Sequence, residues 1–283
     1  MTEIDFPEIP RERENDVYNL EIVDRADLTV FMAGNQFMLV PELLREFQAL
    51  HNDIVTIAYE TLPPGLELDQ IISRGFKYQG KLFKAIPDVY SSVSHSAMQL
   101  LVERGIIDKN DYFIYLHNKL ALMVREGNPK SIHSVEDLAR EDVIVSQPNP
   151  KYEHIAEHIT RMYEQAGGQE LIRAVLEEKK DKGKTILTTV HHRETPDRLI
   201  KGEADVGPVW FTEIMEAYRQ KLRVQGVEVS PKADQRDGIN YYITPLLGCR
   251  NHANALRFLE FIKSPQAQGI FEKYGFISIA YNI

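Results

Sequence analysis

The sequence predicts an α/β protein whose sheets are largely parallel. Short apolar runs of strand length alternate along the chain with longer segments in which apolar residues recur at helical spacing. Polar turns rich in Gly, Pro, Asn or Ser separate these segments. In α/β proteins of this kind, ligands bind beyond the carboxyl ends of the strands, at helix N-termini. We therefore expect the ligand site at the turns that follow strands.

The alternation begins after a charged N-terminal segment. Residues 1–26 contain two prolines and no periodic pattern, so we expect an extended arm. The helix expected at 41–51 is amphipathic, with Leu43, Leu44 and Phe47 on one face. The strands expected here are 28–32, 54–59 and 88–93, and the other helices are 65–73 and 94–104.

The rest of the chain continues the same alternation. The glycine pair 167–168 is expected to stop a helix at 151–166, and a short helix at 135–140 begins at a capping box. Thr195 can cap a later helix that Gly202 can end. The expected strands are 118–125, 143–146, 185–190, 205–210, 227–229 and 241–247, and the further helices are 212–223, 252–263 and 266–274.

Composition and missing motifs narrow the function classes. The net charge of −9 argues against a nucleic-acid or anionic-membrane partner, and no apolar run is long enough for membrane insertion. The single Cys249 excludes an intrachain disulfide. His154 and His158 share a helix face, but no third ligand accompanies them, so we expect no metal site. Nucleotide-binding and common hydrolase motifs are absent, and we expect no cofactor and no catalytic residues.

The segment 185–213 carries the strongest ligand-site signal. An apolar strand leads directly to His191, His192 and Arg193, which stand just before the start of a capped helix. A helix N-terminus has free N–H groups and a partial positive charge, so cationic side chains beside it form an anion cradle. We expect these three residues to bind an anion.

Three other turns meet the same strand-end rule. Asn35 follows the first strand and can donate two N–H bonds. Thr61 offers a hydroxyl in the next turn, and the N–H groups near Gly65 lie at the start of a helix. The third turn is 147–149.

Several segments, in the same order along the chain, resemble the molybdate-binding periplasmic proteins. The resemblance covers residues 27–279, and as a set the segments are typical of the type II solute-binding fold. They are 28–35 at the first strand, the Pro-Asp-Val-Tyr element at 87–90 and 118–129 at the entry to a second domain. The segments 202–207 and 264–276 resemble the family most strongly.

The resemblance implies two α/β lobes joined by two hinge strands, with the ligand in the cleft. The arm would be residues 1–26, the first lobe 27–116 plus 238–283, and the second lobe 117–237. The family's ligand contacts fall at Asn35, near Tyr152, at His192 and at Trp210. The resemblance also implies a periplasmic monomer that delivers an oxyanion to an ABC transporter permease.

We therefore expect a binding protein and not an enzyme, with molybdate or tungstate as the first ligand candidates. Sulfate-like anions, other oxyanions and small organic acids follow, because the family's serine pattern is replaced in this chain. The N-terminus lacks a basic start and an apolar core, so either a signal peptide was removed or the protein is cytoplasmic. The alternatives are a cytoplasmic anion or organic-acid sensor, and an enzyme that uses His191 or His192 as general base.

Overall fold

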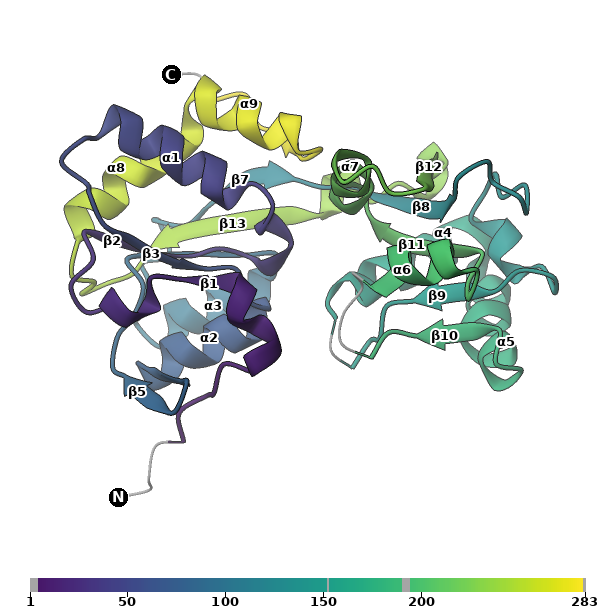
Figure 1. Cartoon of the computed structure of the whole chain (residues 1–283), viewed down its shortest axis with the longest axis horizontal. Helices are drawn as coiled ribbons and strands as arrows, with labels where there is room; N and C mark the ends of the chain where they lie inside the picture. The colour runs from purple at the N-terminus through teal and green to yellow at the C-terminus, as the bar shows by residue number, and fades with distance from the viewer. Residues whose placement is uncertain (1–4, 152, 190–193, 282–283) are drawn as a thin grey trace. The chain divides into compact units, whose positions relative to one another are not determined.

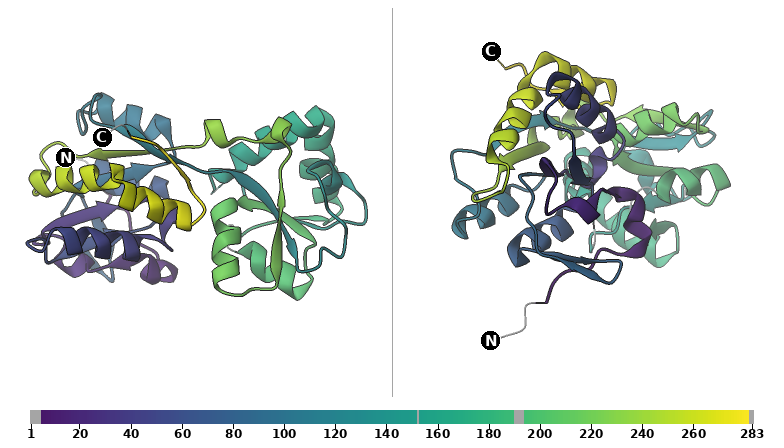
Figure 2. Two further views of the ribbon diagram at one scale, coloured as in Figure 1. Left: turned by 90° about the horizontal axis from the view of Figure 1, so that it is seen from above. Right: turned by 60° about the vertical axis from the view of Figure 1, so that its left-hand side comes forward.

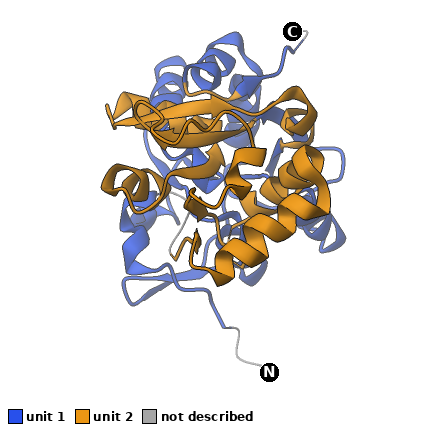
Figure 3. Ribbon diagram, turned by 90° about the vertical axis from the view of Figure 1, so that its right-hand side faces the viewer, with its two compact units in different colours: residues 1–117, 240–273, 277–283 blue, residues 118–239, 274–276 orange. Residues whose placement is uncertain are grey.

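The computed structural model describes residues 5–151, 153–189 and 194–281, and it confirms the α/β fold class (Figure 1). The chain divides into two compact units (Figure 3). Unit 1 comprises Met1–His117, Asn240–Lys273 and Ile277–Ile283, and unit 2 comprises Asn118–Ile239 and Tyr274–Phe276. Among the described residues, no helix combines the length and hydropathy that crossing a bilayer requires.

Unit 1 is built on a seven-stranded mixed sheet. Its central strands β2, β3 and β6 are parallel, and β13 is antiparallel to both β6 and β7. One edge of the sheet therefore collects the carboxyl ends of β2, β3, β6 and β7 and the amino end of β13. We call it the carboxyl edge of unit 1. The strand order is β1 (Val17–Tyr18), β3 (Ile57–Glu60), β2 (Leu28–Phe31), β6 (Val89–Ser92), β13 (Asn240–Pro245), β7 (Phe113–His117) and β14 (Ile277–Ser278).

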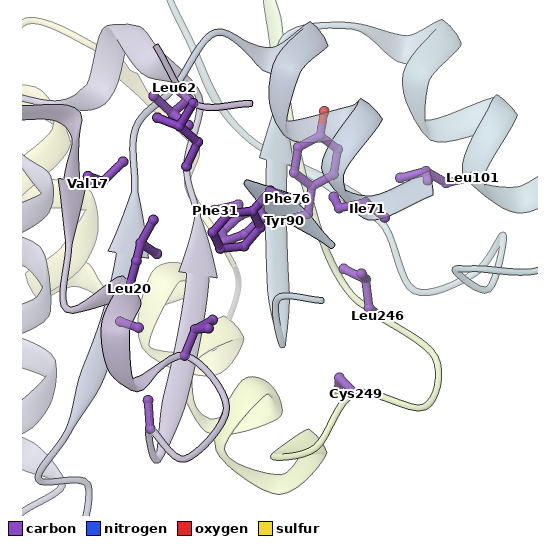
Figure 4. Packing of buried hydrophobic residues seen from close by; sticks show 14 of the residues in the cluster. Val17, Leu20, Phe31, Leu62, Ile71, Phe76, Tyr90, Leu101, Leu246 and Cys249 are labelled. Atoms are coloured by element: carbon purple, nitrogen blue, oxygen red, sulfur yellow. The ribbon is translucent and has the colours of Figure 1, made fainter. Parts of the chain in front are cut away.

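Helices cover both faces of this sheet (Figures 1 and 2). One face carries α1 (Val40–Leu50), α8 (His252–Lys263) and α9 (Pro265–Lys273), and the other carries α2 (Pro64–Ser73) and α3 (His95–Glu103). The apolar stripe of each helix turns inward, as the sequence spacing predicts. Figure 4 shows the core under α2 and α3, which includes Phe31, Ile71, Tyr90, Leu101 and Leu246.

The N-terminal segment belongs to this core, which corrects the expectation of an extended arm for its described part. Residues 5–26 form two 3-10 helices, Arg11–Asp16 and Leu20–Ile22, and strand β1 between them pairs antiparallel with β3. Ile9, Leu20 and Val23 are buried in the core cluster. Their irregular spacing gives no periodic pattern, which is why the sequence did not predict structure here.

The structure also contains a β-hairpin between α2 and β6, where no strand was expected from the sequence. Its strands β4 (Phe76–Tyr78) and β5 (Lys81–Phe83) pair antiparallel. Phe76 is buried and stacks on Phe83 at a centroid distance of 5.4 Å. The N-terminal segment bonds to this hairpin, because the N–H of Lys77 donates to the carbonyl of Pro7 at 2.8 Å.

Unit 2 contains a five-stranded sheet. Strand β9 is parallel to β10 and β11, so the carboxyl ends of these three strands share an edge, which we call the carboxyl edge of unit 2. Helices α6 (Glu194–Lys201) and α7 (Phe211–Arg219) pack against β8 and β11 in one apolar cluster. The strand order is β10 (Thr185–Leu187), β9 (Val145–Gln147), β11 (Val206–Trp210), β8 (Leu120–Arg125) and β12 (Val224–Glu228).

Two helix predictions in unit 2 are wrong in their bounds. The helix α4 runs over Ile155–Arg173, and the chain stays helical through a π-turn at Ala174–Glu178 and α5 at Lys179–Asp181. Gly168 breaks the helical geometry at φ 67° without ending the run. The helix expected at 135–140 is a short 3-10 turn, Glu136–Ala139.

Helix α6 begins one residue earlier than its expected cap. Thr195 lies inside it, and its buried hydroxyl bonds to the hydroxyl of Ser146 at 2.9 Å. This side chain therefore ties the helix to β9 and does not cap it. Gly202 adopts a left-handed conformation at φ 75°, and its N–H donates to the carbonyl of Leu199, so it ends the helix as expected.

Candidate functional site

A glycine brings the turns after β2 and β3 together at the carboxyl edge of unit 1. A Cβ atom on Gly34 would lie 2.8 Å from the carbonyl oxygen of Leu62 and 3.0 Å from that of Thr61. Only glycine permits this approach of one backbone to another. The 3-10 turn Gly34–Gln36 is thereby packed against the Thr61–Leu62 segment.

Gln36 is the centre of a buried hydrogen-bond network at this edge. Its side chain is fully buried, and its Oε1 accepts from the hydroxyl of Tyr115 at 2.6 Å and from Ser91 Oγ at 3.3 Å. Ser91 Oγ in turn accepts from the N–H of Ala33 at 3.0 Å. Gln36 Nε2 has no partner among the described residues. A buried donor of this kind is costly unless something accepts from it.

Asn35 lies next to this network and is half-buried. Its Nδ2 donates to the hydroxyl of Tyr241, a fully buried residue of β13. Tyr115 and Tyr241 are in edge-to-face contact, with ring centroids 6.4 Å apart. The two amide side chains are thus positioned by two aromatic rings of the sheet.

The turn after β6 adds a group of serines to the same edge. Ser92 is fully buried and its Oγ accepts from the N–H of Ser94 at 3.1 Å. Ser94 caps α3, because its Oγ accepts from the N–H of Ala97 at 3.2 Å. The site residues predicted from the sequence do not include Ser91, Ser92 and Ser94, although a serine run after an apolar strand and before a helix is a usable signal.

The turn after β3 is covered by the N-terminal segment. Thr61 is buried, its N–H donates to the carbonyl of Asp16 at 2.8 Å, and its hydroxyl donates to the same oxygen at 3.4 Å. Gly65 is exposed near the start of α2, and nothing lies within 4 Å of a Cβ atom built on it. The N–H of Leu66, expected to be available to a ligand, donates to the carbonyl of Pro63 at 2.9 Å.

The carboxyl edge of unit 2 carries a second polar network. The hydroxyl of Tyr163 donates to Gln147 Oε1 at 2.7 Å. The N–H of Asn149 donates to Thr188 Oγ1 at 3.0 Å and to Glu153 Oε1 at 3.1 Å. The turn after β9 is therefore tied to the residue that follows β10 and to the approach to α4.

The expected anion-binding residues His191, His192 and Arg193, and also Tyr152, lie outside the described residues. The segments on both sides of 190–193 are held by bonds that the structure describes. The N–H of Thr189 donates to Glu194 Oε1 at 3.0 Å. Arg198 donates to the carbonyl of Leu187 at 3.1 Å and to Glu194 Oε2 at 2.9 Å, which leaves its side chain only 12% exposed.

Trp210 ends β11 and is buried, at 3% exposure. Its ring lies 5.7 Å from the ring of His158. Burial, with the charge of Arg161 as a smaller cause, lowers the pKa of His158 to about 4, so this imidazole is neutral at physiological pH. Across the described ranges, no group of three side chains of the His, Cys, Asp and Glu type could hold a metal ion.

Chemically, the described part of the unit 1 edge is a set of neutral donors. The amides of Asn35 and Gln36 and the hydroxyl of Ser92 can donate hydrogen bonds to the oxygens of a dehydrated anion, whereas the hydroxyl of Ser91 donates to Gln36 Oε1.

Comparison with known proteins places this geometry in a family. The model of the family described as bacterial extracellular solute-binding protein matches residues 28–277. A Bacillus subtilis protein named as an ABC transporter substrate-binding lipoprotein is 24% identical over 67% of this chain and 66% of its own length. The sulfate-binding protein of Escherichia coli is 26% identical over 61% of this chain and 56% of its own length. The matches span less than two thirds of either relative.

Solved structures of low sequence identity share the fold. The periplasmic molybdate-binding protein of Azotobacter vinelandii superimposes with a TM-score of 0.67 at 18% identity, covering 89% of this chain and 99% of that one. Iron-bound HitA of Pseudomonas aeruginosa superimposes with a TM-score of 0.68 at 14% identity, covering 90% and 87%. With its two α/β units and a family match over most of its length, the chain belongs to the bacterial extracellular solute-binding proteins.

Proposed function

We propose that this protein captures a small oxyanion with residues at the carboxyl edges of its α/β units, outside the cytoplasmic membrane, and delivers it to an ABC transporter permease. Molybdate or tungstate is the first candidate ligand, and sulfate is the second. The protein acts by binding and not by catalysis, as a monomer and without a cofactor.

The observation that carries this proposal is the buried Nε2 of Gln36, which has no acceptor among the described residues. Tyr115 and Ser91 occupy the Oε1 side of the same amide, so its orientation is fixed. An oxyanion oxygen would satisfy the donor. Asn35 and Ser92 lie at the same edge and offer further polar groups of the same kind.

The anion contacts from unit 2 are proposed to come from His191, His192 and Arg193. The bonds of Thr189 and Arg198 to Glu194 hold the ends of that segment, and Arg193 can bind two oxygens at once. Tyr152 and Trp210 stay as further proposed contacts. Thr61 and Gly65 are proposed to act through the shape of their turn, since the hydroxyl of Thr61 is bonded to Asp16.

The names of the relatives support a transported solute in general and an oxyanion in particular, since they include a sulfate-binding and a molybdate-binding protein. Because one structural neighbour, HitA, is described as iron-bound, a metal ion is the alternative ligand to weigh against an oxyanion. Iron sites are commonly built from carboxylate and imidazole side chains. The neutral donors of the unit 1 edge favour an anion instead.

A thermal-shift panel tests this proposal. Molybdate, tungstate, sulfate, phosphate, ferric citrate and small carboxylates are each added to the purified chain. A ligand present at about 100 times its Kd should stabilise the protein by roughly 2.7 kcal/mol. Stabilisation by ferric citrate and by none of the oxyanions would replace the oxyanion proposal with an iron-binding one.

A further inference from the structure

Two glutamates are buried behind the turn that joins β3 to α2. Glu60 ends β3 and Glu67 lies in the first turns of α2, and both are 0% exposed. Carboxylates are almost never fully buried unless they are paired. A fully buried glutamate pair in the core of unit 1 therefore needs an explanation.

The pair is short of hydrogen-bond partners. Glu67 Oε1 accepts from the N–H of Leu62 at 3.1 Å. The other oxygen of Glu67, both oxygens of Glu60 and both amide atoms of Gln70 lack partners among the described residues. Gln70 is 1% exposed and acts on Glu60 from the next turn of α2, as a hydrogen-bonding neighbour that lowers the pKa of Glu60 by less than burial raises it. Five buried polar atoms of these three side chains thus lack a hydrogen bond of normal geometry among the described residues.

Among the described residues, the groups that act on the pair from other elements supply no compensating positive charge. Asp16 approaches from the N-terminal 3-10 helix, and Arg13 is engaged in an ion pair with it at 3.2 Å. Tyr90 approaches from β6 and Tyr115 from β7. The charged groups that act on Glu67 are the carboxylates of Glu60 and Asp16.

These surroundings favour the neutral, protonated form of the pair. Burial raises the pKa of Glu60 and of Glu67 well above the usual value, and repulsion between the two carboxylates raises the pKa of Glu67 further. A protonated carboxyl also gains an O–H donor, for which the oxygens of the partner glutamate and of Gln70 are acceptors. Protonation therefore relieves both the charge and the missing bonds.

The backbone of Leu62 connects the glutamate pair to the proposed anion site. Glu67 holds the N–H of Leu62, and the carbonyl of Leu62 is the group against which Gly34 packs. Glu67 also acts electrostatically on Tyr115, whose hydroxyl bonds to Gln36. A charge on Glu67 would consequently lie close to any anion held by Asn35 and Gln36.

We propose that the Glu60–Glu67 pair is a proton switch for the anion site. Protonated, the pair is neutral and permits an oxyanion to bind, and ionised at higher pH it repels the anion. The inference rests on the proposed function for its ligand. In general, one charge added within about 10 Å of a bound dianion, at an effective dielectric constant of about 20, changes the affinity for that dianion by more than tenfold.

The first arm of the test needs no ligand. Urea unfolding is measured from pH 5 to pH 9 for the wild type, Glu60→Gln and Glu67→Gln, with Glu213→Gln as control, because Glu213 is a largely buried glutamate of unit 2. The folded protein holds protons that the unfolded chain releases above about pH 4.3. Stability must therefore fall as pH rises, less steeply in the two switch variants than in the control. Parallel curves for all four proteins would overturn the switch.

The second arm is calorimetric titration with molybdate and with sulfate in one-unit steps from pH 5 to pH 9. We expect the wild type and Glu213→Gln to lose at least tenfold more affinity over this range than Glu60→Gln or Glu67→Gln. Titration of His191 or His192 is common to all four proteins and cancels in the comparison. An equal loss in all four would overturn the inference while leaving anion binding intact.

The two arms distinguish a failure of the proposed anion-binding function from a failure of the proton switch. If neither anion binds, the proposed function fails, and the unfolding arm still decides whether the pair holds protons. Addition of Ca²⁺ or Mg²⁺ provides a further check. Stabilisation of the wild type by either cation that is lost in Glu67→Gln would show that the pair is a cation site, which contradicts the proton switch.

Discussion

The hydroxyl of Tyr115 donates a 2.6 Å hydrogen bond to Oε1 of Gln36, and this bond determines which way the buried amide points. Ser91 Oγ donates to the same oxygen at 3.3 Å. With Oε1 occupied in this way, the donor Nε2 is the atom without a partner among the described residues. If the proposed anion site is correct, this tyrosine of β7 helps to present a donor to the ligand.

Tyr115→Phe should therefore impair both stability and binding. Loss of the buried hydroxyl should cost about 1–3 kcal/mol in the free energy of unfolding, because an acceptor loses its strongest donor. Anion affinity should fall as well, since the amide is no longer fixed. The matched control is Tyr281→Phe, which removes a hydroxyl bond of 2.8 Å to the carbonyl of Ile114. The prediction fails if the control loses as much affinity as the variant.

Arg198→Met should destabilise unit 2 and weaken anion binding. The arginine bonds to two carbonyls of β10 and to Glu194, and its removal deprives these partly buried acceptors of a charged donor. We expect a loss of about 2–4 kcal/mol in unfolding free energy. Arg173→Met, which breaks an ion pair between two well-exposed side chains, should cost less than about 1 kcal/mol. Equal effects of the two variants would show that Arg198 does not hold the segment.

Arg193 should matter more than the neighbouring histidines at neutral pH, because arginine stays charged whereas histidine titrates near pH 6.5. Arg193→Ala should cost about 2–5 kcal/mol in binding free energy. His191→Ala and His192→Ala should cost less at pH 8 and more near pH 6. Calorimetry on the three variants at both pH values checks this, and wild-type affinity in Arg193→Ala would remove this turn from the site.

His158 should make the stability of unit 2 sensitive to acid. Its pKa is near 4 in the folded protein and about 6.5 in the unfolded chain, so the unfolded chain binds the proton first as pH falls. Stability is complete above about pH 6.5 and declines towards pH 4, by roughly 2–3 kcal/mol in all. His158→Phe should remove this decline, and His154→Phe, an exposed residue of the same region, should not.

The same titration has an optical signal, because the chain contains one Trp and the ring of His158 lies beside it. Protonation of His158 should quench the fluorescence of Trp210 with a midpoint near pH 4. A midpoint near pH 6.5 would mean that the imidazole is accessible to water, which contradicts its burial.

The fold class and the turns at strand ends could be predicted from the sequence because both depend on local patterns. Apolar periodicity separates strands from helices, and polar residues after a strand identify the edge where Asn35 lies. The N-terminal segment could not be predicted in this way. Its core residues Ile9, Leu20 and Val23 are held by contacts distant in sequence and follow no period.

The site was only partly predictable for a similar reason. The donor of Gln36 is significant because Tyr115, 79 residues away, occupies its oxygen, and no local pattern contains that information. The burial of Glu60 and Glu67 runs against the usual preference of carboxylates for the surface, so a sequence reading places them in solvent.

The central claim is that Gln36 donates to a bound oxyanion, and calorimetric titration of Gln36→Glu with molybdate and sulfate tests it most directly. This substitution keeps the acceptor for Tyr115 and replaces the amide donor by an oxygen. Gln225→Glu, which likewise keeps an acceptor, here for the N–H of Gly127, is the control. We predict one anion per chain in the wild type and in the control, and a loss of about 2–5 kcal/mol in Gln36→Glu. Unchanged anion affinity in a folded Gln36→Glu variant would contradict the account.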